Sequence, residues 1–124
     1  MLLDVYIAFL DGTTDQDGYP KLVENPTTPT RRQSPFFPSG SEAFRELKRR
    51  IEAGMYEGWP IDWGAWGAVV NKQQILDFVA DMYAVDMTES RARLTPLKGT
   101  LTELLVFVEN LDPTIDYALV ASET

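Results

Sequence analysis

Apolar and polar residues alternate through residues 2–10, which is the pattern of a β-strand with one buried face. The residues expected on the buried face are Leu3, Val5, Ile7 and Phe9, and those expected on the mixed face are Asp4, Tyr6 and Ala8. Two later stretches, Trp66–Val70 and Asp116–Ser122, are rich in residue types that favour strands. The hydrophobic pattern therefore predicts three strands, one near each end of the chain and one in the middle.

The clearest helical pattern predicts a helix over about 41–53, where apolar residues fall three or four positions apart. This stripe consists of Phe44, Leu47 and Ile51. Ser39 and Glu42 have the spacing of a capping box, and Gly54 stands where a glycine commonly ends a helix. Both ends of this helix are therefore marked in the sequence.

Two further helices are predicted by the same signals. Asn71 and Gln74 have the spacing of a capping box ahead of a helix over about 72–84, and Thr100 and Glu103 repeat that spacing ahead of a third helix. The apolar stripes consist of Ile75, Phe78, Val79 and Met82 in the second helix and of Leu101, Leu104, Leu105, Val108 and Leu111 in the third. Each stripe is expected to face a common core.

The order strand, helix, strand, helix, helix, strand predicts a small α/β or α+β domain, with a sheet of three to four strands covered by about three helices. A chain of 124 residues fits one domain, expected over residues 1–124. Five prolines predict a Pro-rich loop at about 19–40, within which Lys21–Glu24 is a candidate short edge strand.

The chain has no histidine and no cysteine. A Ser-His-Asp or Cys-His triad, a histidine general base and a His/Cys zinc site are therefore excluded for this chain alone. The sequence also lacks a Walker A motif and a GxGxxG motif, so no cofactor is expected. Without disulfides the chain fits a reducing compartment, and we expect a cytoplasmic protein that is not an enzyme.

Nineteen acidic and eleven basic residues give a net charge of -8 at pH 7. Such a charge repels phosphate backbones and membrane surfaces and attracts basic proteins. The apolar stretches are too short to span a bilayer. The sequence therefore predicts a protein partner with a basic surface, and neither direct nucleic-acid binding nor a membrane span.

Carboxylates are the remaining candidates for chemistry. Asp62 lies among aromatic residues, which suits an acid-base role, although an ordinary turn residue is the simpler interpretation. Asp15, Asp17 and Glu24 match positions 3, 5 and 12 of a calcium loop, but the first position is Thr13. The alternative for this loop is a solvated acidic turn.

All three tryptophans fall within eight residues, in a Gly-rich segment. Tryptophans in such a segment can form a binding platform, because they offer a large contact area at low entropic cost. We expect Trp59 and Trp63 to contribute to such a surface. Trp66 is expected in the core, because it adjoins the predicted middle strand.

Charged residues are unevenly distributed over the predicted helices. The first helix carries Arg45, Lys48, Arg49 and Arg50, and Glu46 lies four residues before Arg50, as in a helical ion pair. The acidic candidates for a partner surface are Asp77, Asp81, Asp86 and Glu103. The alternative is that these carboxylates only keep the protein soluble.

Size, charge and the missing catalytic residue types together favour a small acidic inhibitor that binds and blocks a basic, often nucleic-acid-processing, protein. In length and charge the chain is similar to phage anti-defence proteins, such as anti-CRISPRs, and to bacterial immunity proteins, although it shares no motif with them. That similarity implies stoichiometric binding without turnover.

Three other functions remain open. The first is a small-ligand or carbohydrate-binding module that uses Trp59 and Trp63. The second is an enzyme based on carboxylate, lysine or tyrosine chemistry. The third is a subunit of a homo-oligomer, such as a homodimer.

Overall fold

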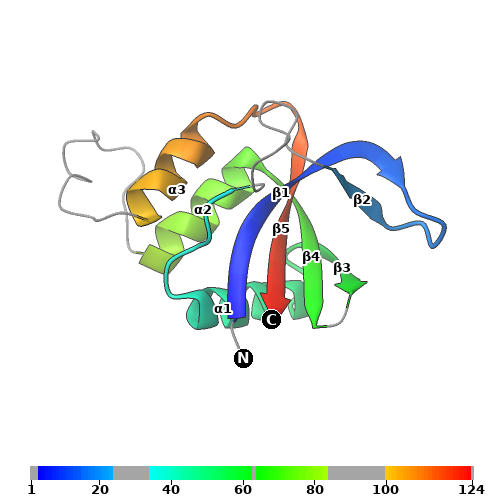
Figure 1. The fold of residues 1–124 in the computed structure, drawn as a ribbon, viewed down its shortest axis with the longest axis horizontal. Helices are drawn as coiled ribbons and strands as arrows, with labels where there is room; N and C mark the ends of the chain where they lie inside the picture. Colours follow the sequence, from blue (N-terminus) through cyan, green and yellow to red (C-terminus); the bar gives the residue numbers. More distant parts are fainter. Residues whose placement is uncertain (1–2, 24–33, 63, 84–99, 124) are drawn as a thin grey trace.

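The structure, a computed structural model, describes residues 3–23, 34–62, 64–83 and 100–123. These residues form five strands and three helices: β1 (Leu3–Thr14), β2 (Pro20–Val23), α1 (Gly40–Glu52), β3 (Glu57–Asp62), β4 (Ala65–Asn71), α2 (Lys72–Tyr83), α3 (Thr100–Glu109) and β5 (Asp116–Glu123). The strands form one antiparallel sheet in the order β2-β1-β5-β4-β3 (Figure 1). The fold is therefore α+β, with one more strand than the largest sheet predicted.

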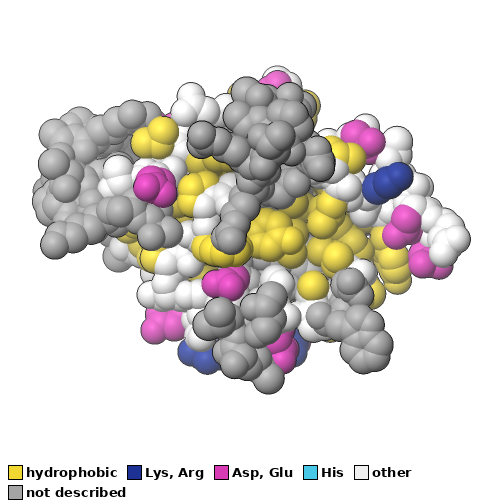
Figure 2. All heavy atoms as spheres, in the orientation of Figure 1, with side chains coloured by type: hydrophobic (Ala, Val, Ile, Leu, Met, Phe, Trp, Pro, Cys, Tyr) yellow, Lys and Arg dark blue, Asp and Glu magenta, His cyan; other side chains and the backbone are white. Residues whose placement is uncertain are grey.

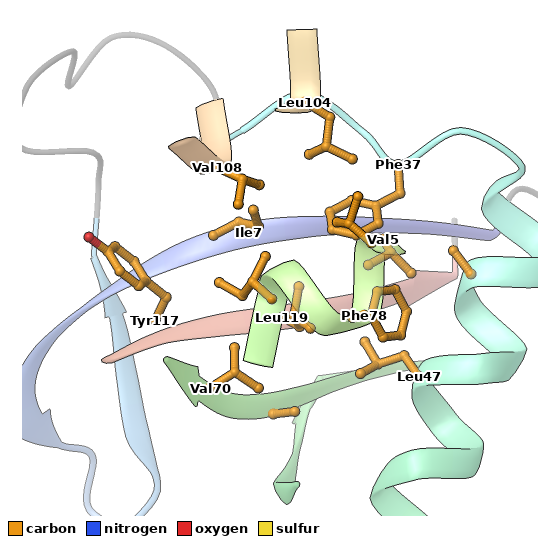
Figure 3. Packing of buried hydrophobic residues seen from close by; sticks show 14 of the residues in the cluster. Val5, Ile7, Phe37, Leu47, Val70, Phe78, Leu104, Val108, Tyr117 and Leu119 are labelled. Atoms are coloured by element: carbon orange, nitrogen blue, oxygen red, sulfur yellow. The ribbon is translucent and has the colours of Figure 1, made fainter. Parts of the chain in front are cut away.

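The helices pack against one face of the sheet and enclose the main core. The alternation predicted for β1 is confirmed, because Val5 and Ile7 are fully buried in this core. Figure 3 shows Val5 of β1 and Leu47 of α1 lying beside Phe78 of α2. None of the helices in the described residues is long and apolar enough to cross a membrane.

The opposite face of the sheet carries a second, smaller apolar cluster, which we call the strand face. Its buried members are Ala8, Trp59, Ala118 and Val120, and the residues packed against them are Tyr6, Leu10, Leu22, Ile61 and Val69. All of these residues belong to strands, and none belongs to a helix. Among the described residues, helices therefore cover one side of the sheet, whereas the apolar cluster on the other side is built from strand residues, with Phe36 packing edge-on against Tyr6.

β3 was not predicted, because Gly58 and Pro60 weaken the strand pattern there. β3 lies at the edge of the sheet, where proline needs no outward hydrogen bond. Gly58 is required by packing, since a Cβ at this position would lie 2.3 Å from Cγ2 of Ile51. The candidate edge strand in the Pro-rich loop is present as β2, whereas residues 24–33 of that loop lie outside the described part of the chain.

The caps predicted at the helix ends are confirmed in two cases and wrong in one. Asn71 and Gln74 form a reciprocal capping box, with both backbone N–H groups donating to the other side chain at 2.9 Å. Gly54 ends α1 with a φ of 76° and donates to the carbonyl of Ile51, as predicted for a glycine at this position. The predicted cap by Ser39 is wrong, because this residue has a φ of 54° and makes no side-chain capping bond. The side chain of Thr100 lies outside the described residues.

Candidate functional site

The predicted roles of two tryptophans are reversed in the structure. Trp59 is only 5% exposed, and its indole lies over Gly67, where an added Cβ would come within 2.7 Å of the ring. Trp66, which was expected in the core, is 37% exposed. Residue 63 and the side chain of Asp62 lie outside the described part of the structure. The predicted binding platform at Trp59 is therefore wrong, because this indole fills the strand face instead of projecting from it.

Arg50 joins α1 to α2 through a buried network. Its guanidinium donates to Glu46 at 2.6 Å, to the hydroxyl of Tyr56 at 2.9 Å and to Asp81 at 2.8 Å, and it lies 5.0 Å from the ring centre of Phe78. The helical ion pair predicted between Glu46 and Arg50 is thus confirmed. Asp81, predicted as a partner contact, is already paired within the molecule.

A pocket of about 530 Å³ lies beside this network. It is lined by charged residues of α1 and by Asp81 and Met82 of α2. Hydrogen bonds from Arg49 and Arg50 lower the pKa of Glu46 to about 2. Three acidic and three basic side chains line this pocket, and Glu46 and Asp81 already pair with Arg50, so the lining as a whole carries no net charge.

The other predicted acidic contacts are only partly described. Asp77 and Glu103 are exposed on α2 and α3, and Asp77 accepts a hydrogen bond from Gln73 at 3.0 Å. Asp86 lies outside the described residues. Asp77 and Glu103 therefore remain available for a partner on the helical side of the molecule.

The calcium candidates lie at the tip of the β1–β2 hairpin. Oδ1 of Asp15 accepts hydrogen bonds from the backbone N–H groups of Asp17 and Tyr19, which is the arrangement of an ordinary turn. Glu24 is outside the described residues. Within the described ranges, no group of three or more acidic side chains is placed to hold a metal ion.

A second pocket, of about 460 Å³, opens where the β1–β2 hairpin leaves the sheet, and we call it the hairpin pocket. It is lined by residues 10–14 of β1 and by Pro20, Val69, Ile115 and Asp116. Leu10 and Val69 also pack on the strand face, so the pocket adjoins that face. Its wall is therefore apolar, with two carboxylates, of Asp11 and Asp116, among the lining residues.

An irregularity in the β1–β2 ladder shapes this pocket. Leu10 pairs with Leu22 and Thr14 pairs with Pro20, so β1 holds extra residues between the two pairs. Gly12 lies within the bulge at a φ of 84°, a conformation that favours glycine. The bulge carries Asp11 beside the start of β5, because Phe9 pairs with Tyr117.

The carboxylate of Asp11 is held in place by its own turn. Its Oδ1 accepts hydrogen bonds from the backbone N–H of Thr13 at 2.9 Å and from the Thr13 hydroxyl at 2.5 Å. These hydrogen bonds lower the pKa of Asp11 below its usual range. A lowered pKa does not suit a general acid, and this carboxylate is better fitted to attract a cation.

The described charges are unevenly distributed, with most of the basic residues on α1. In this part of the chain, the basic residues outside α1 are Lys21 and Lys72, and the Nζ of Lys72 donates to the backbone carbonyl of Glu109 at 2.8 Å. Figure 2 shows Lys and Arg side chains together with Asp or Glu at the lower edge, where α1 lies, and mainly Asp or Glu side chains, with one Lys or Arg, along the hairpin at the right. The acidic residues on the hairpin and in the pocket at its base are Asp11, Asp15, Asp17 and Asp116. We call this group the acidic end.

Asp11 and Asp116 were not singled out as a pair from the sequence. They are far apart in the chain, and only the antiparallel pairing of β1 with β5 brings them to one pocket. The signal that could have found them is the position of each next to a predicted strand end.

Comparisons with protein-family models, with curated proteins and with solved structures found no match to this chain.

Proposed function

We propose that this chain is a small acidic inhibitor that binds a basic surface of a partner protein and blocks it stoichiometrically. The observation that carries the proposal is the distribution of charge, with four of the basic residues on α1 and the carboxylates of the acidic end without an ion pair among the described residues. A one-signed surface attracts an oppositely charged partner and speeds the encounter. A cytoplasmic location fits the absence of cysteine.

The hairpin end supports this proposal better than the helical side does. Asp81 is occupied by Arg50, whereas Asp11 keeps its second carboxylate oxygen outside the hydrogen bonds to Thr13. The adjoining apolar wall supplies surface that a partner can bury. Binding at the acidic end therefore combines electrostatic attraction with apolar contact.

The experiment is capture of partners from the source cells on the immobilised protein, followed by purification of the main partner. We expect a basic protein that binds with one-to-one stoichiometry, loses affinity as salt increases and loses its own activity in the complex. A main partner without a basic surface, or one whose activity is unchanged in the saturated complex, would overturn the proposal. Light scattering of the free protein identifies self-association as a competing explanation.

A further inference from the structure

We propose that the hairpin pocket receives an arginine side chain from the protein partner. This inference rests on the proposed function and names the chemical group that the partner contributes. It is carried by the combination of an apolar wall and two carboxylates in one pocket of about 460 Å³.

The wall of the pocket matches the stem of a long side chain. Leu10 and Val69 are half-buried against the strand face, and Ile115 is 45% exposed beside them. An arginine has three methylene groups that pack on apolar surface while its charged head stays at the rim. Burial of this stem would also cover Ile115, one of the exposed large hydrophobic residues of the described chain.

The head group would meet the two carboxylates. Asp11 is fixed by Thr13 through one oxygen, and Asp116 begins β5 opposite Asn71 in the neighbouring strand. Both residues therefore stand on the ordered frame of the sheet, so that little conformational entropy is lost when they bind. A guanidinium offers donors in a planar fork that suits carboxylates.

The pocket has no basic lining residue of its own. None of its described lining residues is basic, and Lys21, which acts electrostatically on Asp11, is not one of them. The carboxylates of Asp11 and Asp116 are thus without an ion pair among the described residues. An incoming cation would supply the missing charge.

Arginine fits this pocket better than lysine or a metal ion. A guanidinium is more weakly hydrated than an ammonium group, so it loses less hydration free energy on contact with an apolar wall. A hard divalent cation prefers more oxygen ligands than the described residues gather here. The pocket therefore favours a planar organic cation on a flexible apolar stem.

The test is a titration of the isotopically labelled protein, followed by the backbone amide signals in NMR spectra. The probe is the blocked tripeptide acetyl-Gly-Arg-Gly-amide, and its matched control replaces arginine by citrulline, which has nearly the same shape without the charge. We expect the arginine peptide to shift the amides of Gly12, Thr13, Ile115 and Asp116. The citrulline peptide should leave them nearly unchanged.

Variants show whether these carboxylates are responsible. Asp11→Asn keeps an acceptor for Thr13 and removes the charge. Asp116→Asn removes the charge at the start of β5. Each variant is expected to lower the affinity for the arginine peptide about tenfold, which corresponds to one charge-assisted hydrogen bond. Glu52→Gln at the end of α1 is the control, because this exposed carboxylate does not line the pocket, and it should bind as the unchanged protein does. Well-dispersed spectra of each variant verify that it folds.

Three results would overturn the inference: equal shifts with the citrulline peptide, unchanged binding in both pocket variants, or tighter binding of spermidine at the same amides. The last result would identify a site for a free polyamine. If the arginine peptide does not bind while a basic partner still binds in a salt-sensitive way, the assignment of the pocket is wrong and the proposed function stands. If the peptide binds but no basic partner is found, the proposed function is wrong and the assignment of the pocket stands.

Discussion

Nη2 of Arg50 donates to Oδ2 of Asp81 at 2.8 Å, which ties α1 to α2 across the helical layer. The two partners differ in environment, because the side chain of Arg50 is 6% exposed and that of Asp81 is 67% exposed. Removal of each partner therefore has a different consequence.

We expect Arg50→Ala to lower the free energy of unfolding by about 2 kcal/mol, because it removes packing on Phe78 and the hydrogen bond to Tyr56. Asp81→Asn should lower the free energy of unfolding by only about 0.5 kcal/mol. Arg50 keeps its ion pair with Glu46, and an exposed ion pair such as that with Asp81 contributes little to stability. Urea unfolding of both variants measures the difference. Equal losses would contradict the assignment of Arg50 as the centre of the network.

The pairing of Glu46 with Arg49 and Arg50 predicts a pH dependence of stability. The pKa of Glu46 is lowered from 4.5 to about 2 in the folded protein, mainly by the hydrogen bond from Arg49. A lowered folded-state pKa contributes stability above pH 4.5 that is lost as the pH falls toward 2. The stability difference between the unchanged protein and Glu46→Gln should therefore be largest above pH 4.5 and shrink toward pH 2.

Unfolding by urea over this pH range measures that difference. Arg49→Gln provides a matched background, because it removes the largest cause of the lowered pKa. In the Arg49→Gln protein, the stability difference caused by Glu46→Gln should depend less on pH. A difference that stays constant from neutral to acid pH would be inconsistent with the ion pair.

The sequence predicted the elements whose signals are local. Gly54 ends α1 and the reciprocal box of Asn71 and Gln74 begins α2, because each uses backbone groups within one turn of helix. β3 was missed because Gly58 and Pro60 are unfavourable in a strand by propensity. Their presence depends on the edge position of β3 and on close packing against Ile51, which are tertiary facts.

The candidate site was predictable only in part. Asp116 begins one predicted strand and Asp11 follows the end of another, but nothing local relates them. Trp59 was expected on a surface because it lies in a Gly-rich segment with the other two tryptophans, whereas the pairing of β3 with β4 places its indole over Gly67. Long-range strand pairing decides both outcomes, and periodicity within one segment cannot reveal it.

The contact between Trp59 and Gly67 gives a packing prediction. In Gly67→Ala the new Cβ would meet the indole at 2.7 Å and Cδ1 of Ile61 at 2.9 Å. We expect a loss of about 1–3 kcal/mol from overpacking, with a change in tryptophan fluorescence as the indole moves. Gly67→Ala combined with Trp59→Leu should recover part of this loss. If the loss of stability in the double variant equals the sum of the two single losses, the contact between Trp59 and residue 67 is contradicted.

The cap of α2 predicts a coupling between Asn71 and Gln74. Asn71→Ala should lower stability by about 1 kcal/mol, because the backbone N–H of Gln74 loses its acceptor. The double variant with Gln74→Ala should lose less than the sum of the two single losses, since the two bonds share one geometry. A double-mutant cycle measured by urea unfolding gives this coupling directly.

The central claim is that the acidic end binds a basic partner, and the salt dependence of that binding tests it most directly. The measurement compares the affinity of the purified partner for the unchanged protein, for the double variant Asp11→Asn/Asp116→Asn and for the control Glu52→Gln/Glu57→Gln, each at low and high salt. The control removes two exposed carboxylates on α1 and β3, away from the acidic end. The account predicts that affinity falls with salt, and that the acidic-end variant binds more weakly and with less salt dependence than the control does. Equal affinity at both salt concentrations, or a larger loss in the control than in the acidic-end variant, would contradict it.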